Sequence, residues 1–306
     1  MRSIFFIGEC MVELQREGDS MRTRFGGDTL NSAVYLSRLI DHTQFDVAYV
    51  SAIGTDSLSD DMHTMWQQEQ LNTQWVQRLS DKLPGIYLIE TDQRGERSFH
   101  FWRNDSAARY WMQSSRSDEV CAALAQASAI YLSGISLAIL SESDRTRLYR
   151  VLAKCRVGGG QVIFDNNYRP RLWPDRDSAV TAYRAVLQCT DIALLTQEDE
   201  DLLYGPTSPQ ATLVRTQSLG VREIVIKRGA MSCIVTTPET QCEVASTNVT
   251  SVVDTTAAGD SFGAAYIAAR LNGSSAEQAA QAGHRLAATV IQHRGAIIPR
   301  HAMPER

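Results

Sequence analysis

The sequence predicts an α/β protein, and two regularities along the chain carry this prediction. Short runs of β-branched and aromatic residues recur, and helical spacings of apolar residues lie between many of them. Such alternation is typical of a parallel sheet that is covered by helices. Ligands of these sheets bind at the carboxyl ends of the strands, so the residues that directly follow each strand are the first candidates for function.

The individual elements follow from these patterns. Strands are predicted at residues 3–8, 47–54, 86–91, 98–102, 129–133, 161–165, 192–195, 223–227 and 233–237. Helices are predicted at 30–40, 122–127, 183–187, 262–271 and 276–292, the last two in an alanine-rich end of the chain.

Two segments interrupt the alternation. Residues 9–24 are polar and carry no long helical pattern, and residues 84–102 are typical of two strands joined by a turn at 91–95. Together they predict a small sheet set off from the main one. Two interpretations stay open here: a lid over a substrate site, or an ordinary hairpin at the sheet edge.

Composition excludes several classes of protein. Of the 306 residues, 43% are hydrophobic and 21% are charged, which is typical of a soluble globular chain. A net charge of −5 offers no basic surface for nucleic acid or an anionic membrane. The six cysteines form no C-x-x-C pair, so neither a zinc site nor a redox pair is indicated. The first apolar run, residues 4–7, is too short for a signal peptide, and no run could span a bilayer, so we expect a cytoplasmic protein.

The strongest chemical signal is the segment DTTAAGDSF at 254–262, a turn of small residues that leads directly into a predicted helix. The unpaired amides of a helix's first turn attract anions such as phosphate. A carboxylate beside such a site, here Asp260, suits a general base that takes a proton from an attacking hydroxyl. The alternative is that Asp254 or Asp260 only caps the helix.

This segment resembles the C-terminal signature of the ribokinase/PfkB-like carbohydrate kinases, and GGDTLNSA at 26–33 resembles their N-terminal signature. The resemblance covers essentially the whole chain, and no P-loop motif occurs. It implies a single ribokinase-like domain over 1–306, with a doubly wound, mostly parallel sheet flanked by helices and a small β-lid made of segments at about 9–25 and 84–103. It also implies that Asp260 is the catalytic base and that Ala257, Ala258 and Gly259 form the anion hole.

Within the family, three segments are most similar to the kinases of 2-keto-3-deoxygluconate: GECMVEL at 8–14, FHFWR at 99–103 and DNNYRPRLW at 165–173. The carboxylate of a sugar acid needs a cation, ideally a planar guanidinium. The resemblance places Arg103 and Arg169 for this contact. On the residues alone, surface salt bridges would be the simpler explanation of either arginine.

The remaining roles also come from the resemblance. On the sugar side it implies contacts from Gly26, Gly27, Asn31, Tyr87 and Phe101, together with Asp260. On the ATP side it implies contacts from Asn167, Thr196, Lys227, Gly229, Gly259 and His284, with Asp165 reaching a metal ion through phosphates or water. The chain departs from the family in three places. Phe101 stands where relatives can have Tyr, and Ser232 stands near where many members have a second glycine. Thr196 and Asp199 stand where many members have the Asn and Glu of N-x-x-E. This departure puts the usual indirect magnesium contact in doubt.

The resemblance therefore implies ATP-dependent phosphorylation of 2-keto-3-deoxygluconate at its terminal hydroxyl, with ATP and Mg²⁺ as cofactors and the sugar acid and ATP as partners. Two alternatives stay open: a kinase for another sugar such as fructose, and a non-catalytic sugar or nucleotide sensor on the same fold. A nicotinamide-dependent dehydrogenase is disfavoured, because no G-x-G-x-x-G follows the first strand. The sequence does not decide whether a monovalent cation activates the protein or whether a homo-oligomer forms through the lid.

Overall fold

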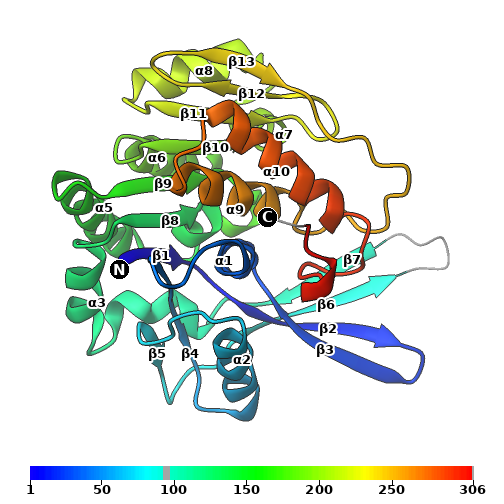
Figure 1. Ribbon diagram of the computed structural model, residues 1–306. Coiled ribbons are helices and arrows are strands. Elements are labelled where there is room, and N and C mark those ends of the chain that lie inside the picture. The colour runs from blue at the N-terminus through cyan, green and yellow to red at the C-terminus, as the bar shows by residue number, and fades with distance from the viewer. Residues whose placement is uncertain (92–96, 305–306) are drawn as a thin grey trace.

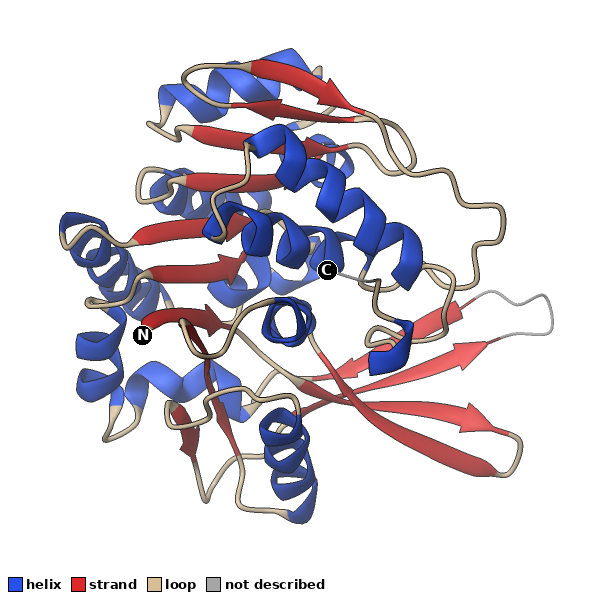
Figure 2. Ribbon diagram, in the orientation of Figure 1, coloured by secondary structure: helices blue, strands red, loops and turns tan. Residues whose placement is uncertain are grey.

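The computed structural model describes residues 1–91 and 97–304. Within this part of the chain, nine strands form a main sheet and four form a smaller sheet that projects from its side (Figures 1 and 2). The main sheet contains, in spatial order, β13 (Gln241–Val244), β12 (Cys233–Thr236), β11 (Glu223–Lys227), β10 (Ile192–Thr196), β9 (Gln161–Asp165), β8 (Ala129–Ser133), β1 (Arg2–Ile7), β4 (Phe45–Ile53) and β5 (Val76–Arg78). The strands from β11 to β5 are parallel, and β12 and β13 add an antiparallel edge.

Helices cover both faces of the main sheet. One face carries α1 (Asp28–Leu39), α2 (Ser57–Gln68), α9 (Ala258–Leu271) and α10 (Ala276–Val290). The other carries α3 (Ser117–Leu124), α4 (Gly134–Ala138), α5 (Glu142–Val157), α6 (Arg176–Leu187), α7 (Gln197–Tyr204) and α8 (Pro209–Ser218). Short 3₁₀ helices lie at Ala107–Gln113, Pro170–Leu172 and Arg300–Ala302. No helix among the described residues is long and apolar enough to cross a membrane.

Strand β1 shows why this sheet is buried on both faces. Ile4 and Phe6 pack into the core on the side of α1 and α9, whereas Phe5 and Ile7 pack into the core on the side of α3 and α5. All four side chains are at most 3% exposed. A near-continuous apolar run is what a parallel strand between two helical layers requires. The predicted α/β class, with its doubly wound and mostly parallel sheet, is confirmed.

The order of the strands also locates a ligand site. From β1 the chain builds outward to β4 and β5 on one side, and it later adds β8 to β11 on the other. Sheets of this kind bind ligands in the crevice at the carboxyl ends of the strands where the direction of building reverses. Here that point lies between β1 and β8.

The smaller sheet contains β3 (Ser20–Gly26), β2 (Met11–Glu17), β6 (Gly85–Thr91) and β7 (Arg97–Trp102), in that order. These strands come from the two segments whose polar and hairpin patterns predicted a separate sheet. At the centre β2 and β6 are parallel, and each has an antiparallel neighbour on its outer side. The turn of the second hairpin is predicted at 91–95. Thr91 is the last residue of β6, and residues 92–95 lie outside the described part of the chain.

Several local predictions differ from the structure. Strands β5 and β13 carry no prediction, since each has only three or four residues and little apolar pattern. The helix predicted at 122–127 begins earlier and ends at Leu124, and the one predicted at 183–187 is only the end of α6. In both cases the first turns of the helix are polar, so apolar spacing does not mark where the helix begins.

Candidate active site

A pocket of about 460 Å³ lies between the carboxyl ends of the main-sheet strands and the small sheet. Its size suits a small-molecule ligand. It is lined by Met11, Gly26, Gly27, Asp28, Asn31, Tyr87, Phe99, Phe101, Ile135, Asp165, Asn167, Arg169, Thr196, Asp199, Lys227, Ala296 and residues 255–260. Most of the residues that the sequence singles out therefore meet here, although they come from distant parts of the chain.

The start of helix α9 forms one wall of this pocket. Ala257 caps the helix in the left-handed conformation, with φ of 60°, and no side chain caps the first turn. Asp254 instead accepts from the backbone N–H of Thr256 at 3.1 Å and from that of Gly295 at 2.9 Å, which fixes the turn before the helix. Neither Asp254 nor Asp260 acts as the cap, so the capping alternative is wrong. The N–H of Ala258 donates to the carbonyl of Thr255 at 3.2 Å. The other amides at the start of a helix have no carbonyl partner within it, so they can face an anion in the pocket.

Asp260 lies in this first turn and reaches the pocket beside α1. Its Oδ2 accepts from Nδ2 of Asn31 at 2.8 Å, and its backbone carbonyl accepts from Oγ of Ser32 at 3.2 Å. Burial raises the pKa of the Asp260 carboxyl to about 8, and the charge of Asp28 adds to the rise, while the Asn31 hydrogen bond opposes it. Within the described residues Oδ1 accepts no hydrogen bond, so it can take a proton from a ligand hydroxyl.

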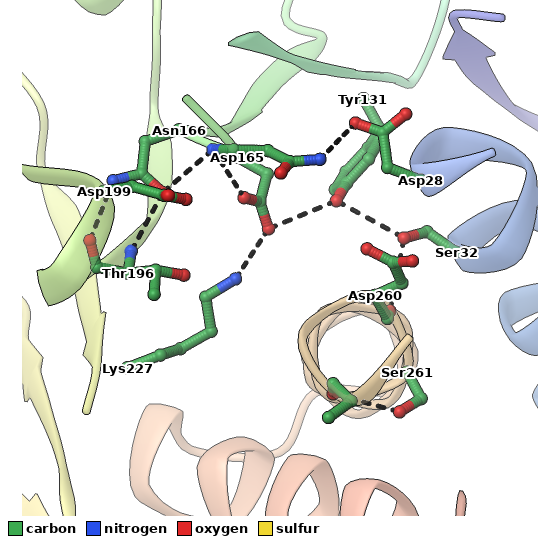
Figure 3. A network of polar contacts seen from close by, with 12 residues as sticks. Asp28, Ser32, Tyr131, Asp165, Asn166, Thr196, Asp199, Lys227, Asp260 and Ser261 are labelled. Carbon is green, nitrogen blue, oxygen red and sulfur yellow. Dashed lines mark hydrogen bonds and ion pairs between the residues drawn. The ribbon is translucent and has the colours of Figure 1, made fainter. Parts of the chain in front are cut away.

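A buried ion pair stands across the pocket from Asp260. Nζ of Lys227, at the end of β11, lies 2.7 Å from Oδ2 of Asp165, at the end of β9. The hydroxyl of Tyr131 donates to the same oxygen at 3.4 Å, as Figure 3 shows. A side chain added at Gly259 would come within 3.5 Å of the Lys227 ammonium. The cation therefore sits next to the amides of α9, where both can face one anionic group.

Two asparagines join the strand ends to each other and to α1. Nδ2 of Asn166 donates to the carbonyl of Thr196 at 3.1 Å, and Oδ1 accepts from the N–H of Thr196 at 2.9 Å, so Asn166 ties β9 to β10 (Figure 3). Asn167 has a φ of 21°, a conformation that L-residues rarely adopt, and its Nδ2 donates to Asp28 at 2.6 Å. Such backbone strain persists where the surroundings over-determine it, as at functional sites. The sequence patterns missed Asn166, although it lies directly after a predicted strand.

The small sheet and the loop before α1 form the opposite wall. A side chain added at Gly27 would meet the backbone carbonyl of Glu9 at 2.1 Å, so only glycine fits there. Tyr87 donates its hydroxyl to Glu13, and its ring lies 5.8 Å from that of Phe101. Glu13, which no sequence pattern singles out, thus holds Tyr87 at the pocket.

The two predicted arginines have different surroundings. Arg169 lines the pocket and lies 3.2 Å from Asp199. Arg103 does not line it. Its guanidinium is buried and pairs with the fully buried carboxylate of Glu9, which also accepts from Ser106. A buried carboxylate needs a compensating cation, so the structure uses Arg103 for Glu9 and brings only Arg169 to the pocket.

Two residues predicted to contact ATP also lie away from the pocket lining. Gly229 is exposed, with φ of 60°, in the loop after β11. His284 is buried on α10 with its ring 5.1 Å from Phe262, and its Nε2 has no hydrogen-bond partner among the described residues. Their contacts with a nucleotide stay predictions.

Comparison with known proteins identifies the family. A family model described as pfkB family carbohydrate kinase matches residues 1–303. The chain belongs to the pfkB family of carbohydrate kinases. A protein from Dickeya dadantii (strain 3937) named 2-dehydro-3-deoxygluconokinase is 55% identical to this kinase over 306 residues, which cover 99% of each chain. A protein of the same name from Escherichia coli (strain K12) is 51% identical over the same coverage.

A solved structure of similar fold supports the architecture of this kinase. The fructokinase from Xylella fastidiosa, solved with bound ATP, has a TM-score of 0.84 and 21% identity, and the match covers 99% of this chain and 95% of that one. The ribokinase-like fold that the resemblance implies is thereby confirmed. Kinases of the pfkB family use ATP, and this chain belongs to that family.

Proposed function

We propose that this kinase transfers the γ-phosphoryl group of ATP to the terminal hydroxyl of 2-dehydro-3-deoxygluconate, which is the systematic name of 2-keto-3-deoxygluconate. The products are the 6-phosphate and ADP. One observation carries the proposal: a single pocket contains a carboxylate beside a helix N-terminus, as phosphoryl transfer requires, and a half-exposed arginine that suits a sugar acid. The names of the full-length relatives agree with it.

The chemical step follows from the arrangement around α9. Asp260 takes the proton of the sugar hydroxyl through Oδ1, and the hydroxyl oxygen forms a bond to the γ-phosphorus as the bond to ADP breaks. The amides of residues 257–259 and the ammonium of Lys227 face the charge that develops on the phosphoryl oxygens, with the Ala258 amide shared between this charge and the carbonyl of Thr255. The hydrogen bond from Asn31 holds Asp260 in place for the proton transfer.

Magnesium and ATP would be held on the side of the strand ends. Within residues 1–91 and 97–304, no group of three or more His, Cys, Asp or Glu side chains could hold a metal ion alone. Mg²⁺ usually keeps waters and phosphate oxygens as ligands and needs only one or two carboxylates, and Asp165 fits that need. Asn167, Thr196, Lys227, Gly229 and His284 complete the proposed ATP site. When bound, the ion neutralises charge on the phosphates.

The sugar acid would lie between α1 and the small sheet. Gly26, Gly27 and Asn31 approach its hydroxyls, Tyr87 and Phe101 cover its carbon skeleton, and Arg169 binds its carboxylate. The small sheet then acts as a lid, whose closure excludes the water that would otherwise hydrolyse ATP. Pairing of this sheet between two subunits and activation by a monovalent cation remain separate questions for experiment.

The test is ADP release by the purified protein with Mg²⁺ and ATP, comparing 2-keto-3-deoxygluconate with fructose, ribose and gluconate. We expect the keto-deoxy acid to be preferred strongly. Turnover with a neutral sugar alone would keep Asp260 as the base but leave Arg169 without a substrate carboxylate. Ligand binding without ADP release from any sugar would favour a sensor.

A further inference from the structure

Arg169 reaches the pocket with only one end of its guanidinium engaged. Nη1 donates to the backbone carbonyl of Tyr168 at 2.8 Å and to Oδ1 of Asp199 at 3.2 Å. Nε and Nη2 donate no hydrogen bond within the described part of the chain, and the side chain is 52% exposed. The edge formed by Nε and Nη2 can bind a carboxylate through two parallel hydrogen bonds. This edge is available to a ligand.

Asp199 is held at the pocket by helix α7. Helix α7 begins directly after β10, and Asp199 is its third residue. The side chain of Asp199 is only 12% exposed. Burial raises the pKa of its carboxyl to about 6, and the charge of Arg169 opposes this rise. The pair of Asp165 and Lys227 also acts on this carboxyl, with opposite signs. The contact between Asp199 and Arg169 therefore stabilises both charges and restrains the longer side chain.

Restraint of an arginine before its ligand arrives affects affinity. An arginine that is free in solvent loses rotamer entropy when a ligand immobilises it. Two acceptors on Nη1 already limit its rotamers, so less freedom is left to lose on binding. They also leave the guanidinium plane with a defined orientation, which a bidentate contact needs.

We infer that Asp199 is a positioning residue for the carboxylate of the substrate, which it serves by holding Nη1 of Arg169 and leaving the edge of Nε and Nη2 for the ligand. This inference rests on the proposed sugar-acid kinase activity and deepens it. Asp199 stands where the resemblance puts the acidic residue of N-x-x-E, and in this structure its carboxylate binds Arg169.

The sign of the effect separates positioning from simple electrostatics. A carboxylate near the site repels an anionic substrate, so the loss of its charge alone would tighten binding of the sugar acid. The loss of positioning weakens binding. An increase in KM for the sugar acid after neutralisation of Asp199 therefore indicates a loss of positioning, because the loss of charge alone would lower KM.

The experiment compares Asp199→Asn with the wild-type kinase by steady-state kinetics, varying the sugar acid, ATP and Mg²⁺ in turn. We expect KM for 2-keto-3-deoxygluconate to rise about 3- to 10-fold, the range that corresponds to immobilising one flexible side chain. KM for ATP and half-saturation by Mg²⁺ should change less than about twofold. In an Arg169→Ala background, Asp199→Asn should add little, because the two residues act as one unit. Asp199→Glu, which keeps the charge, should stay closer to wild type than Asp199→Asn.

Glu198→Gln is the matched control, because Glu198 lies in the same first turn of α7 but is exposed and does not line the pocket. It removes the same charge from the same helix terminus and should leave KM for the sugar acid unchanged. An unchanged or lower KM in Asp199→Asn overturns the inference, as does an effect confined to Mg²⁺. If Asp199→Asn does not fold, Asp199→Ala takes its place. Failure of the wild-type protein to phosphorylate the sugar acid would refute the proposed function itself, which is a different result.

Discussion

The strand ends of the main sheet and the small sheet form opposite walls of one pocket, but they are built differently. At the strand ends, charged groups are already paired with each other, as Lys227 is with Asp165. On the small sheet, Phe99 and Phe101 stack with centroids 6.4 Å apart and are 42% and 48% exposed. Polar groups can find partners before a ligand arrives, whereas an exposed ring gains free energy only when something covers it. The polar contacts are thus already formed on one wall, whereas the aromatic rings of the other wall would be stabilised by a ligand that covers them.

The largest expected effect comes from the wall whose polar contacts are already formed. Asp260→Asn keeps the shape of the side chain but removes the base, so we expect kcat to fall by roughly 10²–10⁴-fold. Sugar binding should be largely retained, because the groups around the carbon skeleton are untouched. Turnover by the purified variant, with sugar binding measured by calorimetry, checks both statements. Near-normal turnover would remove Asp260 from the role of base.

A second substitution tests the buried ion pair at the junction between the main sheet and the small sheet. The pair of Glu9 and Arg103 lies where the chain enters β2 and leaves β7. Arg103→Met would leave Glu9 buried without a cation, so we expect a loss of about 3–5 kcal/mol in the free energy of unfolding. Adding Glu9→Gln should recover part of it, as urea unfolding of both variants can show. A stable single variant would contradict a structural role for this pair.

A smaller effect is expected at the arginine that does line the pocket. Arg169→Ala removes charge-assisted hydrogen bonds, each worth about 1.5–3 kcal/mol, so KM for the sugar acid should rise roughly 10- to 100-fold. Stability should change little, because the side chain is half exposed. Steady-state kinetics and thermal unfolding measure the two. If KM stays unchanged, the carboxylate has another partner.

The pH dependence of the reaction reports the electrostatics of the wall whose polar contacts are already formed. Burial raises the pKa of Asp260 to about 8, so this base is protonated in the free enzyme at lower pH. We expect kcat/KM to fall by about tenfold per pH unit below that value and to level off above it. A profile measured with the sugar acid limiting gives the pKa directly. A flat profile from about pH 6 to 8 would mean that the carboxyl ionises normally.

The smallest effect is expected on the wall with the aromatic rings. Phe101→Ala should raise KM for the sugar acid by only about 3- to 10-fold, and should change the free energy of unfolding by at most about 0.5 kcal/mol, because its ring is half exposed. Trp102→Ala is the control, since adjacent residues of a strand point to opposite faces. Equal effects of the two substitutions would show that the ring does not cover the substrate.

The features that the sequence predicts well depend on local patterns. The strands predicted at 129–133, 161–165 and 223–227 coincide with β8, β9 and β11, because each has a short run of apolar, β-branched or aromatic residues at its centre. The turn before α9 was also predictable, because small residues, a carboxylate and a helix start are adjacent in the chain. The resemblance added roles for residues, and the pocket brings most of them together.

What the sequence could not predict depends on pairs of residues far apart in the chain. Arg103 and Arg169 are equivalent as sequence signals, yet Glu9, 94 positions away from Arg103, takes its guanidinium. Asp199 is 30 positions away from Arg169. No local pattern shows which carboxylate a guanidinium will meet, since the fold alone determines the distance between them.

By itself, the sequence determined the α/β class, the position of the small-residue turn before α9 and the carboxylate of Asp260 beside it, since all three follow from contiguous patterns of side-chain size, polarity and spacing. Only the tertiary structure decided which charges face the pocket and which compensate each other in the interior. The reason is physical: the interaction of two charges depends on their separation and burial, and both are set by how the sheets and helices pack.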